Sequence, residues 1–87
     1  MRSAVVAACH RLAAEGLLIG TSGNVSAREG DQVWVTASGA VLGSITEADV
    51  VSYDDPRATS EVGLHLGIYE SYDVGAVVHT HAPVSTA

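Results

Sequence analysis

The sequence has 87 residues, of which 47% are hydrophobic and 16% are charged, and its formal net charge is -6 at pH 7. A chain of this length is expected to form a single domain, residues 1–87, with a small core, and its apolar content excludes intrinsic disorder. It contains no lysine and only four basic residues, all arginines, which argues against a nucleic-acid partner and against an anionic membrane surface.

The cysteine content and the absence of a long apolar run indicate the compartment. The only cysteine, Cys9, cannot form an internal disulfide, which is typical of a reducing environment. No apolar run approaches the ~20 residues of a membrane span, and the N-terminus has no signal-peptide pattern. We therefore expect a cytoplasmic protein.

The first predicted element is a helix over residues 3–15. Ser3 is a suitable N-cap, apolar residues recur at helical spacing, and Gly16 lies where a left-handed cap belongs. Cys9 and His10 are adjacent in this helix, so their side chains point in different directions. We interpret both as packing or surface residues and not as a joint site.

A turn and a hairpin follow. Residues 20–24, Gly-Thr-Ser-Gly-Asn, are rich in types that tolerate positive φ. This stretch is either a plain turn or a nest of backbone N–H groups for an anion, and it lacks the lysine and the spacing of a P-loop. Residues 25–28 and 32–36 alternate in polarity and predict two strands, which the turn at 29–31 joins into a hairpin.

A second turn of small residues, Ala37-Ser38-Gly39, comes directly after the hairpin. Two such turns at the ends of neighbouring strands can lie side by side and form a pocket of hydroxyls and amides without a fixed cation. Residues 46–49 resemble a capping box that starts one helical turn. Residues 50–53 then predict a third strand, which the turn at 54–57 ends.

The second helix is predicted to start at Ser60, as its N-cap, and to run to about Tyr72. Thr59 and Ser60 are either capping residues or hydroxyls that hold a phosphate at the helix start. Glu61 lies in the first turn, where the helix dipole favours a carboxylate. His65 follows one turn later on the same face, where it can orient Glu61, pack beneath it or ligate a metal. We favour a structural role for His65.

The last predicted strand carries two histidines. Residues 75–78 are apolar and β-branched and predict a buried strand that ends before Pro83. Side chains two apart on a strand share a face, with Cα atoms roughly 6.6 Å apart. His79 and His81 therefore point the same way and can converge on one metal ion, with nitrogens about 2.0–2.1 Å from a zinc. The alternative is two polar residues on a solvated face.

Four short motifs, taken together, resemble a known family. They are Gly23-Asn24-Val25-Ser26, Val35-Thr36-Ala37-Ser38-Gly39, Thr59-Ser60-Glu61 and Val78-His79-Thr80-His81-Ala82. Their order and separations are similar to those of the class II aldolase/adducin superfamily and, within it, the L-fuculose-1-phosphate aldolase branch. The match covers nearly all of the sequence, which corresponds to the N-terminal part of a typical member. We therefore expect residues 1–87 to form an incomplete domain, or one that a partner completes.

The resemblance implies an α/β fold, a three-layer α/β/α sandwich around a mostly antiparallel central sheet, assembled as a homotetramer. It implies metal-dependent aldol cleavage of a sugar 1-phosphate, such as L-fuculose 1-phosphate, to dihydroxyacetone phosphate and an aldehyde. In that reaction Glu61 is the catalytic acid/base, and His79 and His81 bind a divalent metal ion, with zinc the first choice. The residues that it places around the substrate phosphate are Gly23, Asn24, Ser38, Gly39, Thr59 and Ser60.

Other branches of the superfamily supply the alternatives. The sugar-phosphate 4-epimerases, of the L-ribulose-5-phosphate type, usually carry Asp in place of Glu61 and Lys near Thr36, so this sequence favours the aldolase. Adducin-like interaction modules keep the fold without the metal site, and His79 and His81 count against that role. The family's third metal histidine lies well downstream of His81. Within residues 1–87 Glu61 is the candidate third ligand, and an inactive fragment remains an alternative.

Overall fold

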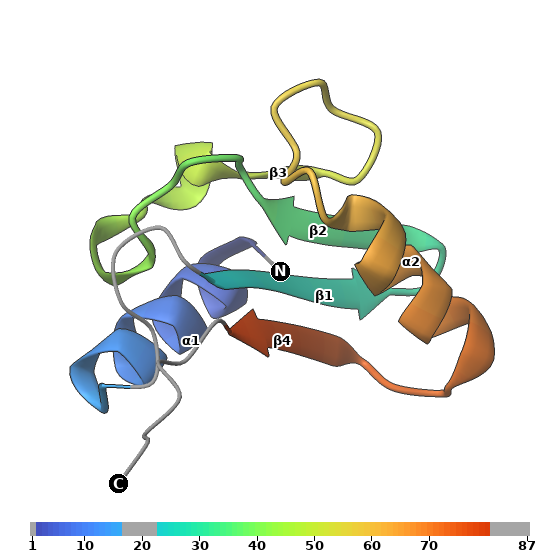
Figure 1. The fold of residues 1–87 in the computed structure, drawn as a ribbon, viewed down its shortest axis with the longest axis horizontal. Helices are drawn as coiled ribbons and strands as arrows, with labels where there is room; N and C mark the ends of the chain where they lie inside the picture. The colour runs from blue at the N-terminus through green and yellow to red at the C-terminus, as the bar shows by residue number, and fades with distance from the viewer. Residues whose placement is uncertain (1, 17–22, 81–87) are drawn as a thin grey trace, which may run out of the picture.

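A computed structural model describes residues 2–16 and 23–80 (Figure 1). The elements in chain order are α1 (Arg2–Ala14), β1 (Gly23–Glu29), β2 (Gln32–Thr36), the 3₁₀ turns η1 (Leu42–Ser44) and η2 (Glu47–Asp49), β3 (Val50–Ser52), α2 (Val62–Ser71) and β4 (Ala76–Thr80). Within these ranges, no helix is long and apolar enough to cross a membrane.

The strands form one antiparallel sheet in the order β3-β2-β1-β4. β1 and β2 are the predicted hairpin, and Gly30 in its turn has a φ of +60°, a conformation that costs glycine little. β4, the last strand in the chain, pairs with β1, so that Asn24 lies opposite His79. This pairing brings the start of β1 next to the end of β4.

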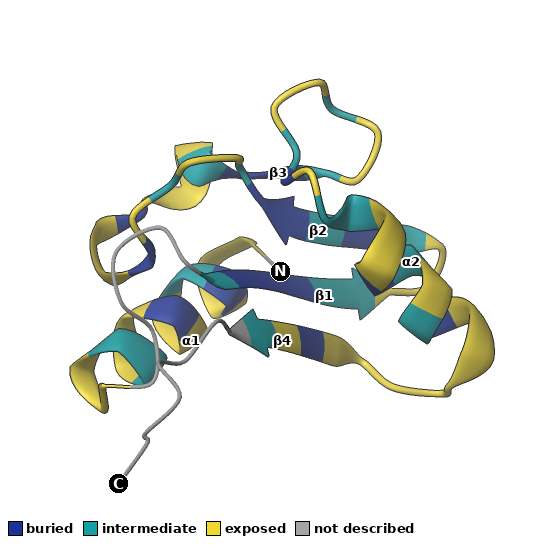
Figure 2. Cartoon of the chain, in the orientation of Figure 1, coloured by how far each residue is buried: buried dark blue, intermediate teal, exposed yellow. Residues whose placement is uncertain are grey.

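The two helices cover opposite faces of the sheet, which makes three layers (Figure 1). On one face, Val5 and Cys9 of α1 pack against Val25 of β1. On the other face, Tyr69 of α2 packs against Val35 of β2. Successive residues of a strand point to opposite faces, so β2 and β3 contribute to both clusters. The buried positions run through the middle of the structure (Figure 2). The predicted layers and the antiparallel sheet are confirmed.

The start of α2 differs from the prediction. The helix begins at Val62 with Glu61 as its N-cap, and the prediction of Ser60 as the cap was wrong. The hydroxyl of Thr59 accepts a hydrogen bond from the Glu61 N–H at 3.3 Å, and the Val62 N–H donates to the Thr59 carbonyl at 3.0 Å. Thr59 is itself held by the sheet, because its N–H donates to the carbonyl of Thr36 at 3.0 Å. The chain therefore turns into the helix at Thr59.

Other boundaries shift by one or two residues. α1 starts before Ser3, so Ser3 is inside the helix and not its cap, whereas Gly16 has the expected positive φ of +76°. β4 continues through Thr80, which places His79 inside the strand and not just beyond it. Pairing with β1 extends β4, and that pairing is not visible in the apolar run of residues 75–78.

Candidate functional site

Three segments that carry the predicted phosphate residues meet at one end of the sheet. Thr36, the last residue of β2, joins them: its side-chain oxygen accepts from the Val25 N–H at 3.2 Å, and its carbonyl accepts from the Thr59 N–H at 3.0 Å. The turn after β2 is held to the segment before α2, because the Ser38 N–H donates to the Arg57 carbonyl at 2.7 Å. The polar segment before α2 and the polar turn after β2 therefore both lie beside the start of β1.

The six residues differ in exposure and in the groups that they leave available. Asn24 and Thr59 are buried, Gly23 is half-buried, and Ser38, Gly39 and Ser60 are exposed. The backbone N–H groups of Ser38 and Thr59 already donate to carbonyls of the protein. An anion at this place would therefore meet the hydroxyls of these two residues and the amide of Asn24, and not those two backbone N–H groups.

Glu61 and His79 come together at the same end of the sheet. Oε2 of Glu61 lies 2.5 Å from Nδ1 of His79. The Glu61 side chain is 33% exposed and the His79 side chain is 30% exposed. Glu61 is at the N-cap of α2, but its side chain makes no capping hydrogen bond; it crosses instead to β4. The two residues that sequence reasoning assigned to acid/base chemistry and to metal binding are thus direct neighbours.

The donor types of this pair suit a metal ion. An imidazole nitrogen and a carboxylate oxygen are both ligands that zinc accepts, and both side chains are partly open to solvent. The predicted second imidazole, His81, lies outside the described residues. In residues 2–16 and 23–80, no group of three or more histidine, cysteine, aspartate or glutamate side chains could hold a metal ion. The described part of the chain supplies two of the predicted donors.

A chain of four buried polar side chains joins β1 to α2 near this pair. The Ser26 hydroxyl oxygen lies 2.6 Å from Nδ1 of His65 and 2.8 Å from the hydroxyl of Tyr69. On the other side of the ring, Nε2 of His65 is hydrogen-bonded to Oδ1 of Asn24. The four side chains, at 7% exposed or less, form a continuous polar path in the core, which we call the buried relay (Asn24, His65, Ser26 and Tyr69).

Sequence reasoning missed the buried relay, although a signal was present. Asn24 and Ser26 are two apart on a strand and therefore share a face, and His65 and Tyr69 are four apart on a helix and share a face. Four polar residues with matching periodicity on two facing elements indicate a hydrogen-bonded contact. The favoured structural role of His65 agrees with this placement.

Burial sets the protonation of the relay. The pKa of His65 is lowered first by loss of solvation and then by repulsion from His79, and Glu61 offsets part of this. Burial likewise raises the pKa of Tyr69, and the hydrogen bond with Ser26 and the charge of Arg28 offset part of this increase. His65 is therefore a neutral imidazole and Tyr69 a neutral phenol at physiological pH. A neutral imidazole has one donor and one acceptor nitrogen.

The residues of α1 do not form a site. Cys9 is completely buried, and burial raises the pKa of its thiol to about 11, which keeps it in the unreactive form. His10 points elsewhere, with Nε2 at 2.8 Å from the carbonyl of Ile45. Cys9 serves in packing and His10 lies at the surface, so the two do not form a joint site, as expected.

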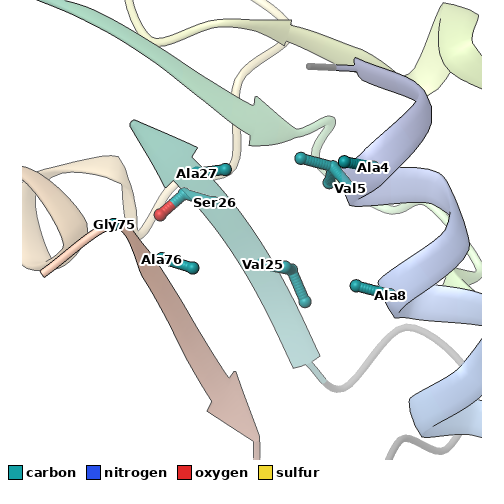
Figure 3. A pocket seen from close by; sticks show the side chains of 8 residues that line it. All are labelled: Ala4, Val5, Ala8, Val25, Ser26, Ala27, Gly75 and Ala76. Atoms are coloured by element: carbon teal, nitrogen blue, oxygen red, sulfur yellow. The ribbon is translucent and has the colours of Figure 1, made fainter. Parts of the chain in front are cut away.

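A groove of about 250 Å³ lies between α1 and the sheet (Figure 3). Its walls are small and apolar, with Ala4 and Ala8 on the helix and Ala27 and Ala76 on the strands (Figure 3). The groove offers no charged group to a phosphate. Ser26 of the buried relay is the one polar side chain among the lining residues, and none of the described residues predicted for phosphate, metal or acid/base chemistry lines this groove.

Comparison with known proteins identifies the family. The profile described as "Class II Aldolase and Adducin N-terminal domain" matches residues 3–87. An L-fuculose phosphate aldolase of Methanococcus maripaludis (strain C7) is 40% identical over 86 residues, which are 91% of this chain and 48% of that protein. A 5-methylthioribulose-1-phosphate/5-deoxyribulose-1-phosphate aldolase of Rhodospirillum rubrum is 40% identical over 94 residues, with 99% of this chain and 42% of that protein covered. The chain spans about half the length of the curated relatives it matches.

Solved structures agree with the sequence comparison. The crystal structure of L-fuculose-1-phosphate aldolase from Thermus thermophilus superposes with a TM-score of 0.78 at 28% identity, covering 91% of this chain and 43% of that one. A second L-fuculose 1-phosphate aldolase gives a TM-score of 0.83 at 26% identity, with 94% and 44% covered. The fold and the family profile lead to the same conclusion: this chain belongs to the class II aldolase and adducin family and corresponds to its N-terminal domain.

Proposed function

We propose that this chain carries the phosphate-binding and metal-binding part of a class II aldolase, which cleaves a sugar 1-phosphate to dihydroxyacetone phosphate and an aldehyde. The main support is the 2.5 Å contact between Glu61 and His79, at the end of the sheet where Thr36 joins the three polar segments. Relatives named as L-fuculose phosphate and 5-methylthioribulose-1-phosphate aldolases support the substrate class.

The substrate phosphate is proposed to bind between the start of β1, the turn after β2 and the segment before α2. The donors for it are the Asn24 amide, the hydroxyls of Ser38, Thr59 and Ser60, and the backbone of the two glycines, Gly23 and Gly39. Neutral donors can hold an anion, and those on a fixed backbone also orient the substrate far from the reacting atoms. A chain without lysine can therefore bind the phosphate.

A divalent metal ion, with zinc as the first choice, is proposed to bind at His79 and His81, with Glu61 as a further ligand or neighbour. Zinc accepts these ligand types, and a catalytic zinc usually has three protein ligands. When bound, the ion supplies Lewis-acid stabilisation of the negative charge that develops on the substrate oxygens. His79 must be neutral to bind it, so metal binding and protonation of this imidazole compete.

Glu61 is proposed to act as the acid/base. In the cleavage, the hydroxyl that becomes the aldehyde carbonyl loses its proton as the carbon–carbon bond breaks, and the electron pair of that bond stays on the dihydroxyacetone phosphate fragment as an enediolate. The carbon that keeps this electron pair must then take up a proton. In the reverse direction the same proton must be removed. A carboxylate at the helix start, held near His79, can move this proton in both directions.

The direct test is cleavage of L-fuculose 1-phosphate by the whole protein loaded with zinc, with dihydroxyacetone phosphate measured as the product. Glu61→Gln is expected to lower kcat by about 10²–10⁴, the usual range for loss of a general acid or base. Glu70→Gln, at an exposed position of the same helix, is the control and should leave the rate unchanged. Absence of product from the zinc-loaded protein, or full activity of Glu61→Gln, would contradict the proposal.

We also propose that the whole protein is a homotetramer and that it is located in the cytoplasm. The family resemblance supports a homotetramer, and the buried thiol of Cys9, as the only cysteine, suits the cytoplasm. The native mass of the whole protein in solution tests the first point. Fractionation of the source cells tests the second.

A further inference from the structure

The orientation of the Asn24 side chain has a physical cause in the core. The amide oxygen of Asn24 is hydrogen-bonded to Nε2 of His65, and an oxygen acceptor requires that this nitrogen carry the proton. The NH₂ end of the amide, with its two donors, is then the end not taken by the ring. Asn24 lies opposite His79 in the β1–β4 pair, and paired residues share a face of the sheet.

We propose that His65 is a positioning residue that fixes the Asn24 amide with its oxygen toward the core and its NH₂ group toward the substrate phosphate. The phosphate part of this inference rests on the proposed function, and the orientation rests on the contacts alone. Asparagine amides rotate easily, and an amide free to rotate presents an acceptor to the anion part of the time. A fixed amide presents donors only.

The rest of the buried relay fixes the tautomer of His65. With the proton on Nε2, Nδ1 is an acceptor, so the Ser26 hydroxyl at 2.6 Å must donate to it. The Ser26 oxygen then accepts from the Tyr69 hydroxyl at 2.8 Å. If Ser26 instead donated its hydrogen to the Tyr69 oxygen, the hydrogen of the Tyr69 hydroxyl would need another acceptor inside the core. The path therefore runs from Tyr69 through Ser26 and His65 to Asn24.

Tyr69 is held firmly at the start of this path. Nη1 of Arg28 donates to the Tyr69 carbonyl at 3.1 Å, and the guanidinium lies 5.1 Å from the centre of the tyrosine ring. The path ends at an amide, which neither gains nor loses a proton at physiological pH. The relay thus orients a group and does not conduct a proton, and we assign His65, Ser26 and Tyr69 an effect on the substrate only through Asn24.

The orientation is tested without substrate, by ¹⁵N NMR of the histidine rings in the whole protein at pH 7.5. The expected result is a neutral His65 with Nε2 protonated and Nδ1 unprotonated. Ser26→Ala should lower the share of this tautomer, and Tyr69→Phe should have the same effect to a lesser degree. A wild-type ring protonated on Nδ1 overturns the proposal, as does a tautomer that neither substitution changes.

The second experiment measures inorganic phosphate binding through the side-chain NH₂ signal of Asn24. Phosphate should shift this signal in the wild type. His65→Leu should weaken phosphate binding about tenfold or more, whereas His65→Gln, which keeps a donor for the Asn24 oxygen, should recover most of the affinity. His10→Leu, on the α1 side of the sheet, is the matched control. Circular dichroism of each variant shows whether it is folded, and Tyr69→Phe serves as the milder variant if His65→Leu is not.

The two experiments separate the failure of this inference from the failure of the proposed function. If the wild type binds phosphate and His65→Leu binds it equally well, the positioning role is refuted while the phosphate site stands. If phosphate does not shift the Asn24 signal although the predicted tautomer is present, the proposed phosphate site is refuted. In that case the orientation of Asn24 serves only the stability of the core, and the inference fails with the site.

Discussion

Removal of the Ser26 hydroxyl is expected to destabilise the protein by about 2–4 kcal/mol. Ser26 is 0% exposed, and its oxygen forms two hydrogen bonds, to His65 at 2.6 Å and to Tyr69 at 2.8 Å. Each such bond contributes about 1 kcal/mol, and each buried partner left without one costs roughly 1–3 kcal/mol. Because the alanine side chain has no hydrogen-bond donor or acceptor, rearrangement of the neighbouring side chains can recover only part of this loss. In a domain of this size the melting temperature should fall by roughly 8–32 °C.

The measurement is urea denaturation followed by circular dichroism, with the free energy of unfolding extrapolated to water. Ser52→Ala is the matched control, because Ser52 is half-buried and accepts one bond, from Gln32 Nε2 at 2.9 Å; its cost should stay below about 1 kcal/mol. Tyr69→Phe removes only one relay bond, so combined with Ser26→Ala it should cost less than the sum, by about 0.5–1.5 kcal/mol. Equal costs for Ser26→Ala and Ser52→Ala, or strict additivity, would refute the hydrogen-bonded path.

Further predictions concern pH, thiol reactivity and packing. The pKa of His65 is lowered by burial and by His79, and only partly restored by Glu61, so the unfolded chain takes up a proton near pH 6.5 while the folded one does not. Stability should therefore be full above that pH and fall below it, by at most ~1.4 kcal/mol per pH unit for this group; His65→Gln should reduce the slope of unfolding free energy against pH. The Cys9 thiol, with its pKa raised to about 11 by burial, should react with a disulfide reagent at pH 8 only after unfolding in urea. Leu42→Ala, at a side chain 1% exposed, should cost about 2–5 kcal/mol, seen as a lower urea midpoint with an unchanged slope.

Local patterns were enough to predict most of the elements. The hairpin followed from two alternating stretches and a turn with Gly30 at positive φ. The capping box at residues 46–49 is confirmed, because Asp49 Oδ2 accepts from the Thr46 N–H at 3.0 Å. The left-handed cap at Gly16 is confirmed as well. In each case the cause lies within a few residues of the effect.

The features that sequence reasoning missed depend on contacts between distant segments. Thr59 and Ser60 are both reasonable helix caps, and the sheet decides between them, because Thr36 holds Thr59. His79 lies inside β4 because the strand is extended by pairing with β1. The buried relay needs α2 packed on the face of β1 that carries Asn24. A pattern read one element at a time contains no such information.

The candidate site was predicted through the combination of motifs and not through any one of them. Spacing alone placed His79 on one face of a strand, and the helix dipole alone accounted for Glu61 as an acid of the first turn. Only the family resemblance brought the two together, and the 2.5 Å contact between them agrees with it. The roles of these residues remain predictions until the variants above are measured.

At the N-cap of α2, the candidate site is present at the expense of the stability of the fold. The residue at a helix start normally bonds the exposed N–H groups of its own helix, and loss of that cap costs about 0.5–2 kcal/mol. Glu61 makes no such bond, because its carboxylate is turned to His79. A library of variants sorted for thermal stability alone should therefore replace Glu61 by serine, asparagine or aspartate, whereas a library sorted for aldol cleavage should retain it.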